Sequence, residues 1–236
     1  MTSPEVLTAT RESLHRVAEH LLAATRKRAT GEITLAQGAG GFRTPPLPDG
    51  SALAVDGTVL VVSEPGSVRR ERLRTIAQAA DFAGVPAGFP WTKYPPATPF
   101  EPDAPLTLDE AAAAALADWF RLGQEALSAL AGEVAGESPS EPQIFPEHFD
   151  LGITAGPVNY GFSPGDDTIA EPYVYVPTGI GICSCGLPWR PNTSVFCSRG
   201  NLLSGSGAYV NSYRRRRCET TVQFARLITS TCVSTR

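Results

Sequence analysis

The stretch that decides the fold is Leu53-Ala54-Val55-Asp56-Gly57-Thr58-Val59-Leu60-Val61-Val62, where two apolar runs flank an Asp-Gly pair. This arrangement is the strongest short-range signal for a β-hairpin, because Asp and Gly accept the backbone angles of a tight turn. We therefore predict two antiparallel strands here. The preceding segment 40–46 ends in two prolines, which cannot donate to a strand ladder, so we expect an edge strand or a loop there.

Three helices are predicted around this β region. The first begins at Ser3-Pro4, runs over residues 4–27 and carries an apolar stripe. The second is expected over residues 67–83, with Gly84 as its stop. The third is expected over residues 108–131, after a capping box formed by Thr107-Leu108-Asp109-Glu110.

Short strands follow the third helix. Residues 149–153 and 158–162 could pair across Ala155-Gly156, and residues 173–176 alternate like a strand. Helices and strands therefore come in blocks rather than in strict alternation. This order favours an α+β fold, an antiparallel sheet with about three helices, in a single domain over residues 1–176.

Composition sets limits on the class of protein. The chain has 236 residues, of which 42% are hydrophobic and 19% charged, as in an ordinary globular protein. No apolar run approaches the roughly 18–20 residues of a membrane span. The first residues lack the basic and apolar segments of a secretory signal, so we expect a soluble cytoplasmic protein without a membrane partner.

Charge divides the chain near residue 177. Residues 1–176 carry 12 Lys and Arg against 23 Asp and Glu, whereas residues 177–236 carry eight arginines and one acid, Glu219. The acidic balance of the first part argues against a nucleic-acid partner. The apolar residues of the second part are broken up by Gly, Pro and Ser, so we expect an irregular, poorly packed tail.

All five cysteines lie after residue 176. Structural zinc sites need close pairs of ligands, and only Cys183 and Cys185 are close, with a single residue between them. A disulfide framework needs an oxidising compartment and an even count. We favour a third interpretation, a frame-shifted translation, because sliding the frame by one base from Pro177 permits a sequence with more acids and fewer cysteines. The five are Cys183, Cys185, Cys197, Cys218 and Cys232.

Polar residues that could carry chemistry concentrate between residues 145 and 175. If this piece is extended, His148 and Asp150 point to the same face and could bind a divalent metal or form a base-orienting pair. A turn at Ser163 could bring Asp166 or Asp167 towards them. The alternative is ordinary turn chemistry and a structural hydrogen bond for His148. The candidate catalytic residues are His148, Asp150, Asp166 and Glu171, and the candidate ligand-binding residues are Asn159 and Tyr160.

Other possible sites look weaker. His15 and His20 lie five apart on the first helix, and Glu12 and Glu19 flank His15 at helical spacing, which is typical of a solvated, charged face. The arginine-rich run 69–74 could bind phosphate but is more typical of a surface. No phosphate-binding loop, nucleophile elbow or zinc-protease motif is present.

Four segments together resemble a family of uncharacterised bacterial proteins from high-GC genomes. They are Gly40-Gly41-Phe42-Arg43-Thr44-Pro45-Pro46, Tyr94-Pro95-Pro96-Ala97-Thr98, Phe145-Pro146-Glu147-His148-Phe149-Asp150, and Asn159-Tyr160-Gly161-Phe162-Ser163-Pro164-Gly165-Asp166. Residues 171–176 belong to the same resemblance, which covers residues 30–176. It implies no activity and no catalytic residue.

Two hypotheses about function remain open. The first is an enzyme or small-molecule-binding protein with its site among residues 145–175. The second is a non-catalytic interaction module in which these residues form turns and strands. Convergence of at least three of the candidate polar side chains in one pocket favours the first.

Overall fold

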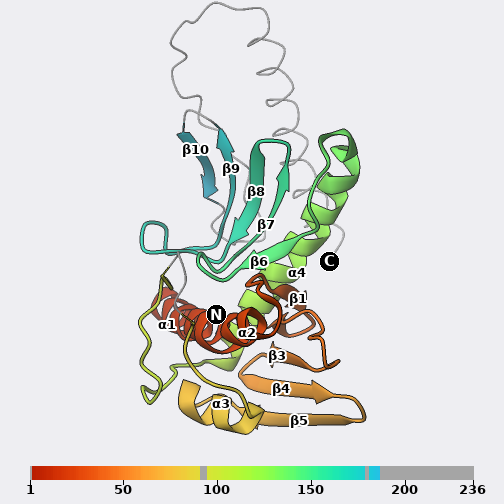
Figure 1. Ribbon diagram of the computed structural model, residues 1–236. Coiled ribbons are helices and arrows are strands. Elements are labelled where there is room, and N and C mark those ends of the chain that lie inside the picture. The colour runs from red at the N-terminus through yellow and green to blue at the C-terminus, as the bar shows by residue number, and fades with distance from the viewer. Residues whose placement is uncertain (1, 91–94, 179–180, 187–236) are drawn as a thin grey trace, which may run out of the picture.

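The computed structural model describes residues 2–90, 95–178 and 181–186. The fold is α+β, as predicted, and its strands are antiparallel, but they form two sheets where one was expected. Each sheet has five strands, in the orders β1-β2-β3-β4-β5 and β10-β9-β8-β7-β6. In the view of Figure 1, the β6–β10 sheet lies above, the β1–β5 sheet below, and α1 and α2 between them.

The first helical segment is continuous but changes its winding. It consists of α1 (Pro4–Val17), the π-helical turn η1 (Ala18–Ala23) and α2 (Ala24–Thr30). Ser3 caps its start by accepting a hydrogen bond from the Val6 N–H, and Gly31, in the left-handed region at φ 84°, ends it. The predicted apolar stripe is buried, with Leu14, Val17, Ala18, Leu21 and Leu22 at most 3% exposed.

The predicted hairpin is confirmed in the first sheet. Val55 pairs with Leu60 across the turn, in which Gly57 has a positive φ of 61°. The segment 40–46 supplies an interior strand rather than an edge, because β2 pairs with strands on both sides. The strands are β1 (Ala36–Gly38), β2 (Gly41–Arg43), β3 (Ala52–Asp56), β4 (Val59–Glu64) and β5 (Ser67–Arg72).

The helix predicted over residues 67–83 is wrong in its first half. Residues Ser67–Arg72 form the edge strand β5, and the helix α3 covers only Ile76–Ala83, capped by Thr75 and ended by Gly84 as expected. In β5 only Arg69 and Glu71 are partly covered, and the other four residues are exposed. Two of the four arginines of this run have local partners, since Arg70 pairs with Asp56 and the Arg69 guanidinium stacks on Phe82.

The third predicted helix, α4 (Glu110–Glu133), starts at a different cap from the one expected. Asp109 accepts the hydrogen bond from the Ala112 N–H, while the N–H of Thr107 donates to Ser13 on α1. The helix packs closely against the second sheet at Gly123, where an added Cβ would lie 2.9 Å from the Phe162 ring. A glycine at this position therefore lets the helix approach the sheet.

The second sheet contains the other predicted hairpin. Strands β7 and β8 pair from Leu151 with Phe162 to Ala155 with Val158, around a turn at Gly156. Leu35, the residue before β1, exchanges two backbone hydrogen bonds of 2.8 Å with Ile144 on β6 and so connects the two sheets. The strands are β6 (Gln143–Phe145), β7 (Asp150–Ala155), β8 (Val158–Ser163), β9 (Tyr173–Thr178) and β10 (Gly181–Gly186).

The sheet continues past the predicted boundary at residue 176, since β9 extends to Thr178 and β10 pairs with it. The other predictions made for residues 177–236, the irregular tail and the frame-shifted translation, fall mainly on residues outside those the structure describes. Within the described residues, no helix is long and apolar enough to cross a membrane.

Candidate functional site

A pocket of about 540 Å³ lies where α1 meets the β6–β10 sheet. Its volume falls within the range of ordinary small-molecule sites. Four segments far apart in the sequence form its wall: α1, the loop at residues 97–98, the β6–β7 turn, and strands β7 to β9 with the loop between β8 and β9. The lining residues with polar side chains are Arg11, Glu12, His15, Thr98, Glu147, His148, Asp150, Asn159, Ser163, Asp166, Asp167, Tyr173 and Tyr175.

The π-helical turn η1 anchors the loop that contributes Thr98. In this turn the N–H of Ala24 bonds to the carbonyl of Glu19, five residues back, instead of to His20. The His20 carbonyl accepts a hydrogen bond of 2.9 Å from the Gly88 N–H. The local change in winding thus offers a backbone acceptor to a distant segment.

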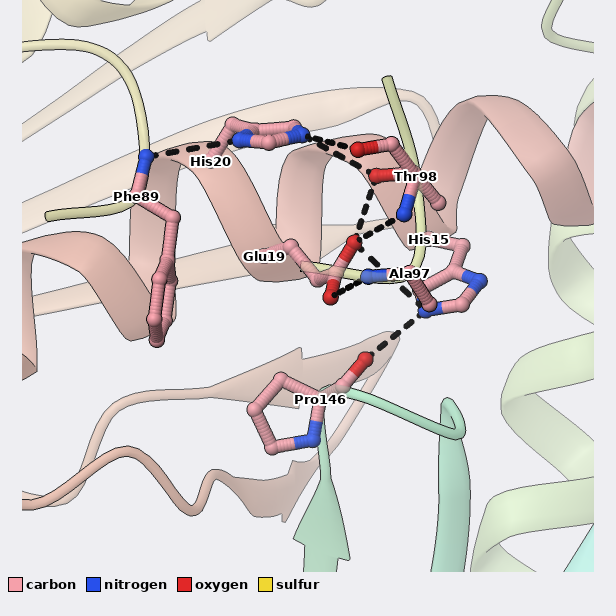
Figure 2. A network of polar contacts seen from close by, with 7 residues as sticks. All are labelled: His15, Glu19, His20, Phe89, Ala97, Thr98 and Pro146. Atoms are coloured by element: carbon pink, nitrogen blue, oxygen red, sulfur yellow. Dashed lines mark hydrogen bonds and ion pairs between the residues drawn. The ribbon is translucent and has the colours of Figure 1, made fainter. Parts of the chain in front are cut away.

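The carboxylate of Glu19 is the centre of this anchor, as Figure 2 shows. It is 2% exposed and accepts hydrogen bonds from the N–H groups of Ala97 (2.8 Å) and Thr98 (2.7 Å) and from the Thr98 hydroxyl (2.5 Å). Both oxygens are therefore satisfied, which is what a buried carboxylate requires.

His15 and His20 complete the network on either side of Glu19 (Figure 2). His20 is fully buried; its Nδ1 accepts from the Phe89 N–H, so Nε2 carries the hydrogen and donates to the Thr98 carbonyl at 3.0 Å. His15 Nε2 lies 2.7 Å from the Pro146 carbonyl, and burial lowers the pKa of this ring. The solvated face predicted around His15 is wrong for His15 and Glu19, which the segments at residues 97–98 and 146 cover, whereas Glu12 stays partly exposed.

Asp150 is the most unusual group in the pocket wall. It is 6% exposed, its Oδ2 accepts a hydrogen bond from the Tyr175 hydroxyl, and burial raises its pKa despite that bond. Its Oδ1 is shielded from solvent and accepts no hydrogen bond from the described part of the chain. Glu147 Oε2, on the adjoining turn, is also shielded from solvent and accepts no hydrogen bond from the described residues.

Gly161 makes the contact between Asp150 and Tyr175 possible. Asp150 is on β7 and Tyr175 on β9, with β8 between them, and Gly161 is the β8 residue in register with Tyr175. A Cβ at Gly161 would lie 2.2 Å from Cζ of the tyrosine ring. The ring therefore crosses β8 over a position that tolerates no side chain.

The turn between β6 and β7 is not extended, contrary to the assumption made for His148 and Asp150. Residues 146–149 form a turn, and Phe149 adopts φ 53°, a left-handed conformation that is costly for a bulky residue. Its ring is held by a stack on His15 at 5.2 Å and by edge contacts with Phe42 and Phe120. His148 is exposed at the pocket edge.

Asp166 organises the loop between β8 and β9. Its Oδ1 accepts from the N–H groups of Thr168 and Ile169, both at 2.7 Å, and its Oδ2 from the Tyr173 hydroxyl at 2.5 Å. Burial alone would raise its pKa, but these hydrogen bonds and the nearby Arg11 outweigh burial and lower it. The same surroundings raise the pKa of Tyr173 to about 12, mainly through burial.

Arg11 links the loop to α1. Its side chain is 4% exposed, with Nε and Nη2 bonded to Glu12 and Nη1 bonded to the Ala170 carbonyl at 3.0 Å. Gly165, at φ 103°, lets the loop approach this guanidinium, because a Cβ there would lie 2.5 Å from Nη1. Arg11, the one Lys or Arg among the described residues of the pocket wall, thus already has partners within the protein.

The structure brings four of the six candidate residues to this pocket: His148, Asp150, Asn159 and Asp166. The other two lie elsewhere, since Tyr160 is 5% exposed within the hydrophobic core and Glu171 is exposed and does not line the pocket. Within residues 2–90, 95–178 and 181–186, no three His, Cys, Asp or Glu side chains are placed to hold a metal ion.

Sequence reasoning missed the contribution of α1 and β9. Arg11, Glu12 and His15 line the pocket although they lie more than a hundred residues before the predicted segment. One signal was available in the sequence: residues 17–24 are apolar except for Glu19 and His20, and the structure buries the whole run. Charged residues inside such a run require buried partners.

Comparison with known proteins gives no relative: no family model matches the chain, and neither does any curated protein or solved structure. The resemblance to a bacterial family therefore stays a prediction.

Proposed function

We propose that the chain is a small-molecule-binding protein whose site is the pocket between α1 and the β6–β10 sheet. The observation that supports this most is the convergence of four candidate side chains on one pocket of about 540 Å³. Concave sites with a few converging polar groups and perturbed carboxylates are typical of ligand binding. Asp150 fits this description best, because it is buried with one oxygen unpaired.

The test is a thermal-shift screen of a metabolite library against the full chain, repeated with the variant Asp167→Trp. Asp167 is exposed and lines the pocket, so an indole there would fill it. Thr168→Trp is the matched control, because Thr168 is the next residue, is exposed and does not line the pocket. A ligand that stabilises the wild type and Thr168→Trp but not Asp167→Trp supports the proposal. No stabilising compound, or equal binding by all three proteins, contradicts it.

A second candidate function is acid–base catalysis on the bound molecule. It is favoured by the opposite pKa shifts of Asp150, raised by burial, and Asp166, lowered by its hydrogen bonds. Two carboxyl groups with such different surroundings are suited to opposite roles, one as an acid and one as a carboxylate. An acid–base enzyme would lose turnover in Asp150→Asn while still binding its substrate.

The interaction-module hypothesis also has support. Asp166 holds a turn, and the Asn159 side chain accepts a hydrogen bond of 2.8 Å from Thr154 on the neighbouring strand. Both are structural uses of candidate residues. An empty metabolite screen, combined with replacements that change stability alone, would favour this alternative.

A further inference from the structure

We infer that the ligand of this pocket is a small organic cation whose N–H groups pair with the carboxylates of Glu147 and Asp150. The inference rests on the proposed function and adds the charge and chemical class of the ligand. It starts from three features of the pocket: its excess of acids, its two unpaired carboxylate oxygens, and its tyrosine wall.

Acids outnumber cations in the pocket wall. The guanidinium of Arg11 donates hydrogen bonds to the Glu12 carboxylate and to the Ala170 carbonyl. Within the described residues, no Lys or Arg forms an ion pair with the other acids of the wall. Those acids are Glu147, Asp150, Asp166 and Asp167.

The two unpaired oxygens mark where a ligand can place hydrogen-bond donors. Asp166 is satisfied by N–H and O–H donors, but Asp150 Oδ1 and Glu147 Oε2 are shielded from solvent and accept no hydrogen bond from the described chain. An unpaired carboxylate is costly to bury, and a donor that carries positive charge offsets this cost best. An ammonium or guanidinium group supplies both the charge and several N–H donors.

The aromatic wall suits the same class of ligand. Tyr173 and Tyr175 both line the pocket, and their ring centroids are 6.2 Å apart. The Tyr175 hydroxyl donates to Asp150 and the Tyr173 hydroxyl to Asp166, so each phenol already uses its hydrogen. The rings remain as surfaces for a cation or for the apolar part of an amine.

The experiment measures binding of matched probes to the full chain by calorimetry at neutral pH. Phenethylamine is compared with 2-phenylethanol, and putrescine with 1,4-butanediol, so that each pair differs in its charged nitrogen. We expect each amine to bind at least about tenfold more tightly than its alcohol. Asp150→Asn retains the shape and an acceptor for Tyr175 but removes the charge, and it should weaken amine binding by about tenfold.

Asp81→Asn is the control variant, because Asp81 is exposed on α3 and does not line the pocket; it should bind the amines like the wild type. The inference is overturned if the alcohols bind as tightly as the amines, if 3-phenylpropionate binds more tightly than phenethylamine, or if Mg²⁺ or Mn²⁺ binds and displaces the amines. In those cases a ligand still occupies the pocket and the proposed function stands. If no probe binds and the metabolite screen is also empty, both proposals fall.

Discussion

Glu19 and Asp150 are both buried carboxylates, 2% and 6% exposed, but their surroundings differ. Every oxygen of Glu19 accepts hydrogen bonds from the loop at residues 97–98, whereas one oxygen of Asp150 has no donor among the described residues. A fully paired group stabilises the fold, and an unpaired one weakens it. Glu19 is therefore expected to stabilise the fold, whereas Asp150 keeps one oxygen able to accept a further hydrogen bond.

The largest expected effect comes from replacing Glu19, the carboxylate whose two oxygens are both hydrogen-bonded. Glu19→Gln should lower the free energy of unfolding by about 3 kcal/mol. Each Glu19 oxygen accepts from an N–H group, so either orientation of the amide places its NH₂ against a donor. The measurement is urea unfolding at neutral pH.

Glu133→Gln is the matched control for this variant. Glu133 is exposed at the end of α4, so its replacement should change stability by no more than about 0.5 kcal/mol. Equal stability of the Glu19 and Glu133 variants would show that the network in Figure 2 contributes little to stability.

A smaller effect is expected from the glycine that lets Tyr175 reach Asp150. Gly161→Ala should cost about 2 kcal/mol, because its Cβ forces the tyrosine ring out of place. It also takes the Tyr175 donor away from Asp150, which sharpens the contrast with Glu19. Gly132→Ala is the control: nothing lies within 4 Å of a Cβ there, so alanine in this helix should leave stability unchanged or raise it. An equally neutral Gly161→Ala would contradict the proposed packing.

The sequence was sufficient where the signal is local. The two hairpins, the Ser3 cap and the Gly84 stop depend on a few adjacent residues, and the structure forms all of them. Each turn lies one residue later than predicted, at Gly57-Thr58 and Gly156-Pro157, because Asp56 pairs with Val59 and Ala155 with Val158. The edge strand β5 was mistaken for a helix because Ser67–Arg72 lacks a buried apolar face, so neither helical nor strand periodicity is marked.

The candidate site was found in part for the same reason. His148, Asp150, Asn159 and Asp166 lie within one segment, so a concentration of polar residues revealed them. The contributions of Arg11 and His15 depend on how α1 packs against the sheet, and the pairing of Asp150 with Tyr175 depends on strand register. Neither can be inferred from a single sequence, because both are set by tertiary contacts.

The smallest expected change in stability comes from Asp150→Asn, and its sign is opposite to that of Glu19→Gln. Asp150→Asn should raise the free energy of unfolding at pH 7 by about 1 kcal/mol. The amide keeps an acceptor for Tyr175 and removes a charge whose burial is incompletely compensated.

The pH dependence of the stability difference between Asp150→Asn and the wild type tests whether the buried charge of Asp150 causes it. Burial raises the pKa of Asp150 above its ordinary value of 3.8, so the folded chain holds the proton more tightly than the unfolded chain. Stability from this group is therefore greatest below pH 3.8 and decreases as the pH rises towards the folded-state pKa. Because asparagine does not titrate, the advantage of Asp150→Asn should be largest at neutral pH and vanish below about pH 4. Urea unfolding of the wild type and Asp150→Asn between pH 3.5 and 8 measures this advantage. If the variant is less stable than the wild type, or if the difference does not depend on pH, Asp150 stabilises the fold as Glu19 does and the prediction is wrong.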